Sequence, residues 1–283
     1  MSRHVGVVGA GTMGVGVSQA FAEGGCRVTL VDTSADALAA ARERIAVDSR
    51  MAALFDRNPA GKAGEITFTT GFEHLADTCF VVENVTENVE VKRVVHERLD
   101  EICPAECVFG VNTSAIPITQ VAGYTGRPDR VIGTHFMNPA QLKPLVEVIR
   151  GFHTSPETVA ATRSLLAAIG KESIVVHDSP GFVTNRVAML TVNEAICLLD
   201  EGVATAADVD RLFVRCFGHR MGPLATADLI GLDTVLYSLD VLVEQFGDPK
   251  YRPSTLLRQY VTAGLLGRKS GRGFFTYDIE PVR

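Results

Sequence analysis

Short apolar runs alternate with longer amphipathic segments through the first two thirds of the chain. The apolar runs, which are typical of buried strands, cover residues 5–8, 27–32, 66–70, 79–85, 107–111, 131–136, 145–149 and 173–176. Helical segments lie between several of them, at residues 15–24, 35–54, 89–102 and 156–169. This alternation predicts a parallel sheet covered by helices.

The predicted helix at residues 89–102 shows which of its faces we expect to be buried. Val91, Val94, Val95 and Leu99 recur there at helical spacing, so this stripe is predicted to face the sheet. His96 lies among the charged residues of the same segment, and we expect it to be solvated.

A glycine-rich turn follows the first predicted strand. Gly9, Gly11 and Gly14 have the spacing G-x-G-x-x-G, and a predicted helix begins directly after them. The first glycine permits a tight turn, the second lets a pyrophosphate approach bare backbone, and the third lets helix pack on strand. Because the helix N-terminus also attracts the phosphate charge, this arrangement predicts a dinucleotide site.

Asp32 indicates which dinucleotide is bound. It ends the second predicted strand, 18 residues after Gly14, where a carboxylate accepts hydrogen bonds from the adenine-ribose 2′-hydroxyl and repels a 2′-phosphate. The next three residues, Thr33, Ser34 and Ala35, supply no cation for such a phosphate. We therefore expect NAD rather than NADP.

The strand signals end near a D-S-P-G segment at residues 178–181, and the remainder is almost entirely helical in pattern. We predict an α/β protein: a Rossmann-like, mostly parallel sheet domain that binds NAD in residues 1–180, followed by an all-α C-terminal domain in residues 181–283 for substrate and dimerisation. A length of 283 residues with 46% hydrophobic content is ample for two such cores.

Charge and cysteine content narrow the class of partners. The formal net charge of −6 argues against a general nucleic-acid or anionic-membrane surface. Apolar runs of 18 or more residues are absent, so we expect no transmembrane helix. The six cysteines form no C-x-x-C pair and have no histidine cluster beside them, so we expect a reduced, cytoplasmic protein without a metal site.

Polar residues gather where predicted strands end, which is the edge at which open α/β sheets bind ligands. Asn112, Thr113 and Ser114 follow one strand, and His135 lies at the end of another. Glu147 lies 12 residues later, inside the apolar run 145–149, where an unpaired acid would be costly to bury. Pairing with His135 resolves that conflict and leaves one ring nitrogen basic, as a general base for alcohol oxidation requires.

Each of these residues also has an ordinary structural interpretation. A histidine near a strand end can be purely structural, and a strand acid can lie on a solvated edge. Asn112 and Ser114 can cap the next turn. Their convergence on one edge of a nucleotide-binding sheet favours the catalytic interpretation.

These residues belong to a longer series of motifs that resembles the (S)-3-hydroxyacyl-CoA dehydrogenases, including bacterial 3-hydroxybutyryl-CoA dehydrogenases. The resemblance extends along nearly the whole chain. Its segments are G-A-G-T-M-G (9–14), E-N-V-T-E-N-V-E-V-K (83–92), N-T-S (112–114), H-F-M-N-P (135–139), L-V-E-V-I-R-G (145–151), D-S-P-G-F-V-T-N-R (178–186), M-G-P-L-A-T-A-D-L-I-G-L-D (221–233) and G-R-K-S-G-R-G-F-F (267–275).

The resemblance implies a reaction and a role for each matching residue. The family oxidises the 3-hydroxyl of an acyl thioester to a ketone, reversibly, with hydride passing to NAD. By resemblance, His135 is the catalytic base with Glu147 as its partner, and Ser114 and Asn185 contact the substrate oxygen. The positions that match NAD contacts of the family are Glu87, Lys92, Ser114, Asn138 and Lys269. Lys92 and Lys269 would otherwise be interpreted as solvated charges.

The resemblance also implies a homodimer formed through the helical domain. The apolar stretch at residues 228–243 fits such an interface, and it fits an intramolecular core equally well.

Two departures from the family pattern concern the substrate. Residues 140–144 read A-Q-L-K-P where the family has an apolar run, which would place an amide and a cation beside the base, and Ala115 stands where a second serine is usual. The substrate is therefore expected on CoA or, alternatively, on an acyl carrier protein, as in enzymes that oxidise glyceryl-carrier protein for polyketide extender units. An alternative from another class is a non-catalytic NAD-binding protein, as among lens crystallins related to this family.

Overall fold

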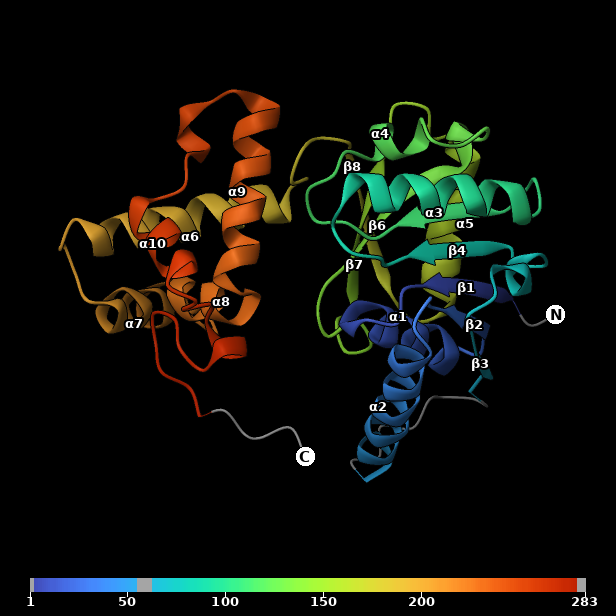
Figure 1. Cartoon of the computed structure of the whole chain (residues 1–283), viewed down its shortest axis with the longest axis horizontal. Coiled ribbons are helices and arrows are strands. Elements are labelled where there is room, and N and C mark those ends of the chain that lie inside the picture. Colours follow the sequence, from blue (N-terminus) through green and yellow to red (C-terminus); the bar gives the residue numbers. More distant parts are fainter. Residues whose placement is uncertain (1–2, 55–62, 279–283) are drawn as a thin grey trace. The chain divides into compact units, whose positions relative to one another are not determined.

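A single sheet organises the N-terminal part of the computed structural model, which describes residues 3–54 and 63–278 (Figure 1). The eight strands of this sheet have the spatial order β3-β2-β1-β4-β5-β6-β7-β8. Their bounds are β1 (His4–Val8), β2 (Arg27–Val31), β3 (Ile66–Thr69), β4 (Phe80–Glu83), β5 (Val108–Val111), β6 (Val131–Phe136), β7 (Leu145–Arg150) and β8 (Glu172–His177). The predicted α/β class and the mostly parallel sheet are confirmed.

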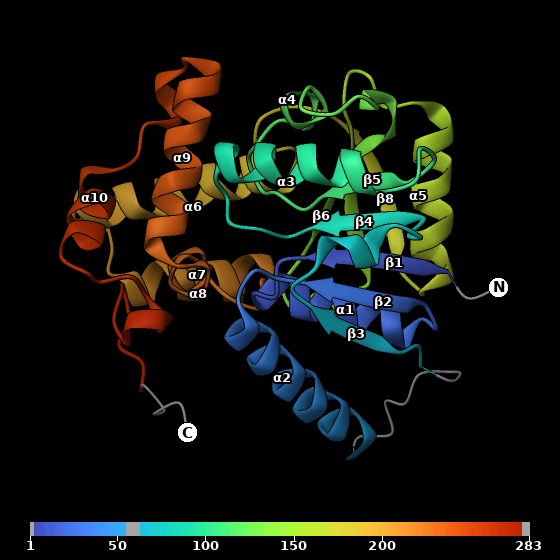
Figure 2. The ribbon, with the colours of Figure 1, turned by 45° about the vertical axis from the view of Figure 1, so that its right-hand side comes forward.

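The sheet is parallel except where β7 meets β6. The strands from β3 to β6 run in one direction, and Figure 2 shows β1, β2 and β3 side by side. β7 is antiparallel to β6 and parallel to β8. The segment between β6 and β7 contains no helix and is too short for the crossover that a parallel pair would need, so the chain must reverse there. This reversal makes His135 and Glu147 direct register partners.

Helices cover both faces of the sheet. They are α1 (Thr12–Glu23), α2 (Ala35–Leu54), α3 (Val89–Ile102), α4 (Ile118–Ala122) and α5 (Pro156–Ala168). Phe21 of α1 and Leu166 of α5 pack in one core with Val7, Phe80 and Phe136, which point to the same face of the sheet. On the other face, the ring of Phe109 in β5 meets the ring of a histidine from α3. Alternation along the strands thus separates two buried layers.

The prediction for the buried face of α3 holds for Leu99 and fails for Val91 and Val94. Val91 and Val94 are 39% and 58% exposed, whereas Lys92, His96 and Leu99 are fully buried. The helix has two competing stripes of residues at helical spacing. The stripe that carries Lys92 and His96 faces the sheet, and the stripe with Val91 and Val94 faces away from it. The reason is a buried acid in β4, described below, that supplies the counter-charge of Lys92 and lies beside His96.

The second compact unit consists of helices, and the chain divides between Ser179 and Pro180, beside the predicted boundary. Its helices are α6 (Thr184–Asp200), α7 (Ala206–Phe217), α8 (Pro223–Ile230), α9 (Leu232–Phe246) and α10 (Thr255–Thr262). Met189, Ile196, Leu224, Leu239 and Tyr251 are central to its core. None of the helices within residues 3–54 and 63–278 combines the length and hydropathy that crossing a bilayer requires.

Candidate active site

The structure brings Ser114, His135 and Glu147 together at the edge where the parallel strands end. Glu147 Oε2 lies 3.0 Å from His135 Nδ1, and Ser114 Oγ lies 3.1 Å from His135 Nε2. The histidine and the glutamate are 7% and 4% exposed. When the carboxylate accepts the Nδ1 proton, Nε2 becomes the basic nitrogen and faces the serine hydroxyl. This hydroxyl–imidazole–carboxylate arrangement can take a proton from an alcohol.

The turn that presents Ser114 is shaped by Glu87. One carboxylate oxygen of Glu87 accepts hydrogen bonds from the Ser114 and Ala115 amides, at 3.1 and 3.3 Å, and from the hydroxyl of Thr113. Glu87 thus bonds the turn after β5 directly. Its predicted contact with NAD stays a prediction.

Asn112 joins three strand ends instead of capping the turn after β5. Its side-chain nitrogen Nδ2 donates to Asn84 Oδ1 at 2.6 Å, and its side-chain oxygen Oδ1 accepts from the Phe136 backbone amide at 3.1 Å. These bonds connect the ends of β4 and β6 through β5. They hold the Ser114 turn beside the strand that carries His135.

The glycine-rich turn has the geometry that a dinucleotide needs. Gly9 adopts a φ of +100°, and an added Cβ at Gly14 would lie 1.7 Å from the Gly9 carbonyl oxygen. By contrast, an added Cβ at Gly11 would meet nothing within 4 Å. Gly11 begins α1 without a capping side chain, and the first turn contains no acid. The open backbone at a helix N-terminus fits a pyrophosphate.

Asp32 lies directly after β2 and faces this turn. Its carboxylate accepts from the Ala10 amide at 2.7 Å and from the Ser34 amide at 2.9 Å. The carboxylate is therefore held beside the glycine-rich turn, where the adenine ribose of NAD is expected.

A buried charged cluster of Glu83, Lys92 and His96 lies behind the Ser114 turn. Lys92 Nζ donates to both oxygens of Glu83 at 2.9 Å and lies 3.7 Å from Glu87 Oε2. His96 Nε2 lies 3.4 Å from Glu83 Oε2. Burial alone would raise the pKa of Glu83, but the Lys92 ammonium and the contact with His96 outweigh it, so the pKa of Glu83 is lowered.

This cluster corrects one expectation and adds one residue. His96 is fully buried, not solvated. Lys92 is fully buried too, so the alternative interpretation of it as a solvated charge does not hold. Glu83 was missed, although it carries the same signal as Glu147: an acid within an apolar strand, here F-V-V-E. A cation and a histidine nine and thirteen residues later completed that signal. The predicted contact of Lys92 with NAD stays a prediction.

The loop after β6 differs from the expectation that it lines the space beside the base. Asn138 is exposed, and Ala140 is buried in the core beside α1. An added Cβ at Gly16 of α1 would lie 2.9 Å from Gln141 Oε1, so this amide packs against α1. His135 and Glu147 point to the other face of the sheet, because strand residues alternate and their neighbours Phe136, Val146 and Val148 belong to the α1 layer.

Two predicted site residues belong to the second unit. Asn185 lies in the first turn of α6 and is partly buried. Lys269 Nζ pairs with Asp233, with its nearest carboxylate oxygen at 2.5 Å, and its side chain is 47% exposed. Their contacts with substrate and cofactor stay predictions.

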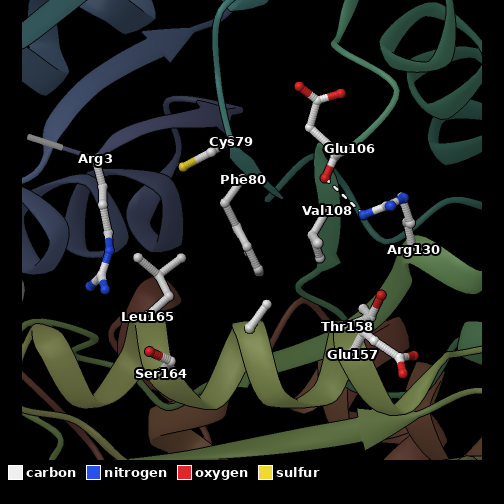
Figure 3. A pocket seen from close by; sticks show the side chains of 11 residues that line it. Arg3, Cys79, Phe80, Glu106, Val108, Arg130, Glu157, Thr158, Ser164 and Leu165 are labelled. Carbon is white, nitrogen blue, oxygen red and sulfur yellow. Dashed lines mark hydrogen bonds between the residues drawn. The ribbon is translucent and has the colours of Figure 1, made fainter. Parts of the chain in front are cut away.

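A cavity of about 380 Å³ opens at the opposite edge of the sheet and is separate from this site (Figure 3). Phe80 and Val108, at the starts of β4 and β5, line it together with Leu165 of α5. Arg130 borders it and donates to the Glu106 carbonyl at 3.0 Å. Ligands of parallel sheets bind at the carboxyl ends of strands, so we do not expect NAD or the substrate in this cavity.

The fold is that of an NAD-dependent oxidoreductase, and its sheet holds a histidine bonded to a buried carboxylate. Residues 4–179 match the family model of the 3-hydroxyacyl-CoA dehydrogenase NAD-binding domain, and residues 181–277 match that of the C-terminal domain. The chain belongs to the 3-hydroxyacyl-CoA dehydrogenase family, as the resemblance implied. NAD is therefore confirmed as the cofactor class.

Similar proteins cover the chain almost completely. It is 42% identical to a probable 3-hydroxybutyryl-CoA dehydrogenase of Bacillus subtilis, over 98% of each chain. It is 40% identical to a 3-hydroxybutyryl-CoA dehydrogenase of Bradyrhizobium diazoefficiens, over 99% of this chain and 97% of the relative. The crystal structure of (S)-3-hydroxybutyryl-CoA dehydrogenase from Ralstonia eutropha has a TM-score of 0.93 and 42% identity, over 98% of this chain and 100% of the other.

The glycine geometry predicts opposite outcomes for two alanine substitutions. Gly14→Ala should lower the free energy of unfolding by about 1–3 kcal/mol, because its Cβ overlaps the Gly9 carbonyl. Gly11→Ala should unfold like the wild type, yet bind NADH at least about tenfold more weakly, a loss of about 1.4 kcal/mol, because the methyl group fills the space for pyrophosphate. Urea denaturation and NADH fluorescence titration measure the two effects. Wild-type NADH affinity in Gly11→Ala would contradict the placement of the pyrophosphate.

The buried cluster predicts a pH-dependent contribution to stability. Glu83→Gln should lower the free energy of unfolding at pH 7 by about 3–5 kcal/mol, because it leaves the Lys92 ammonium buried beside a neutral amide. The pKa of Glu83 is lowered in the folded state, so its carboxylate stabilises the fold above the unfolded pKa of about 4.3. The stabilisation is lost as the pH falls through the folded value.

Urea denaturation from neutral to acidic pH measures this difference between wild type and Glu83→Gln. The matched control is Glu101→Gln, which breaks an exposed ion pair with Arg98 and should change stability little at any pH. Equal effects of the two substitutions at pH 7 would show that the buried pair contributes no more than a surface pair.

Proposed function

We propose that this protein oxidises (S)-3-hydroxybutyryl-CoA and related short 3-hydroxyacyl-CoA thioesters to 3-oxoacyl-CoA with NAD⁺, and catalyses the reverse reduction. The observation that carries the proposal is the Ser114–His135–Glu147 arrangement at the strand ends of an NAD-binding sheet. The names of full-length relatives at about 40% identity support the CoA thioester.

The chemistry of the chain's own residues follows from the geometry. His135 Nε2 takes the proton of the 3-hydroxyl, while the Ser114 hydroxyl, 3.1 Å from that nitrogen, can hydrogen-bond the same oxygen. The Glu147 carboxylate holds the ring through Nδ1 and stabilises the imidazolium that forms. When bound, NAD⁺ supplies the acceptor for the hydride that leaves C3. We propose that Asn185 of α6 provides a second contact to the substrate oxygen.

We further propose a homodimer formed through the helical unit. Much of the stretch 228–243 is intramolecular core, since Leu232, Val235, Leu239 and Leu242 are fully buried. The neighbouring helix α7 nevertheless exposes Leu212 and Phe217, at 55% and 70%. We call these two residues the α7 patch and assign a second copy of this chain to it, because the family resemblance implies dimerisation through this unit. A cytoplasmic location stays a prediction.

His135 is predicted to be essential for turnover but not for cofactor binding. His135→Gln should lower kcat for acetoacetyl-CoA reduction by about 10²–10⁴-fold while NADH affinity stays near the wild-type value, because only the proton transfer is lost. Glu147→Gln should lower kcat as well. Absorbance at the NADH band measures turnover, and fluorescence titration measures binding. The matched control is His153→Gln, an exposed histidine of the same unit that should leave both values unchanged.

The same assay separates the alternative functions. Near-normal turnover in His135→Gln would contradict the assignment of the base. A wild-type protein that is silent with acetoacetyl-CoA but active with a carrier-protein thioester would overturn the CoA proposal in favour of the carrier-protein enzyme. Silence with every thioester, together with intact NADH binding, would indicate the non-catalytic binding protein.

The dimer proposal predicts a selective effect of charge on the α7 patch. Phe217→Asp should convert a dimer into a monomer in multi-angle light scattering, because a carboxylate would be buried unpaired at the interface. Phe152→Asp, at an 83% exposed phenylalanine of the sheet unit, should remain a dimer. A dimeric Phe217→Asp would exclude the α7 patch as the interface.

A further inference from the structure

Lys171 is a buried cation that the proposed reaction does not use. It directly precedes β8, is 8% exposed, and forms no ion pair with any residue in the described part of the chain. Its ammonium instead donates to three backbone carbonyls, those of Ala140, Gln141 and Lys143, at 2.8, 3.1 and 2.7 Å. Three carbonyl oxygens that converge on one point would repel one another without a cation between them.

These carbonyls all belong to the connection between β6 and β7. That connection joins the strand of His135 to the strand of Glu147, and its second residue is Asn138, a predicted NAD contact. A turn directly after Asn138 is closed by the Leu142 and Lys143 amides, which both donate to the Pro139 carbonyl at 3.1 Å.

The same connection also packs against the cofactor helix. Ala140 and Gln141 would meet a side chain at Gly16 within 3.2 Å, so no space separates them from α1. Burial lowers the pKa of Lys171, although the nearby Glu23 carboxylate of α1 opposes this effect. Burial of an ammonium is costly, and here its hydrogen bonds to three carbonyls offset that cost while they hold the backbone segment in one conformation.

We propose that Lys171 is a positioning residue for the NAD site: its ammonium holds the β6–β7 connection against α1, and thereby fixes Asn138 and the His135–Glu147 pair relative to the cofactor. Lys171 touches neither substrate nor cofactor in this role. The turnover part of its test rests on the proposed function, whereas the NADH-binding part does not.

The test compares Lys171→Met, which keeps an unbranched side chain of similar bulk and removes the charge, with Lys171→Arg, which keeps the charge. In Lys171→Met we expect KM for NAD⁺ and the Kd for NADH to rise about tenfold and kcat to fall about tenfold. Lys171→Arg should recover a large part of both losses. A merely structural role would lower the active fraction, and hence apparent kcat, while KM and Kd stayed unchanged.

Hydrogen exchange followed by mass spectrometry gives a second, local measurement. The Leu142 and Lys143 amides should exchange faster in Lys171→Met than in the wild type, while amides of β1 stay protected. The matched control is Lys143→Met, which removes an exposed cation from the same connection and keeps its carbonyl. It should change neither KM, Kd nor exchange.

Unchanged KM, Kd and amide exchange in Lys171→Met would overturn the proposal. If the wild-type protein reduced no thioester, only the proposed function would be contradicted. NADH titration and hydrogen exchange would still test the role of Lys171.

Discussion

The site depends on one constraint: a carboxylate inside an apolar strand needs a partner, and the residue opposite Glu147 on β6, His135, bonds it directly. A parallel arrangement of β6 and β7 would require a crossover that the short connection cannot provide. The reversal therefore places His135 and Glu147 in register, on the face away from α1. The tautomer of the imidazole that the proposed reaction needs follows from this pairing, since the carboxylate accepts the proton on Nδ1.

The same constraint operates two strands away in the same sheet, at the end of β4. Glu83 is buried there and is compensated by Lys92, which also approaches Glu87, the acceptor of the Ser114 amide. Two buried carboxylates thus act on the neighbourhood of Ser114 and His135. Glu147 bonds the His135 ring directly, and Glu83 acts through Lys92 on Glu87, which bonds the Ser114 turn. Such networks stabilise only when every member is paired, so a change in one member affects the geometry of the others.

Much of this arrangement was predictable from the sequence, because the relevant signals are local. The glycine spacing, the strand ends and the acid at Glu147 each stand out within about 20 residues. The sheet class and the encounter of His135 with Glu147 followed from them. The buried face of α3 did not, since Val91 and Val94 gave an equally regular stripe. The choice between the valine stripe and the Lys92–His96 stripe depends on the position of Glu83 against the helix, which only the tertiary structure gives.

Lys171 could not have been identified from sequence for a related reason. Its partners are carbonyl oxygens, which every residue has, so side-chain identity contains no trace of the contact. Only the path of the chain makes the three carbonyls converge. The hydrogen bond that the Phe136 amide donates to Asn112 Oδ1 likewise involves a backbone group, which side-chain identity does not reveal.

The path of the β6–β7 connection also bears on what carries the acyl group. The departure at residues 140–144 suggested an amide and a cation beside the base, and hence an unusual substrate. In the structure Gln141 packs on Gly16, Lys143 is exposed, and Ala140 is buried in the α1 layer, whereas His135 points to the other face. The polar substitutions therefore alter how the connection meets α1, and not the lining of the proton-transfer site. Gln141 and Lys143 therefore give no reason to expect a carrier-protein thioester, and the CoA thioester in the names of the relatives is the simpler substrate.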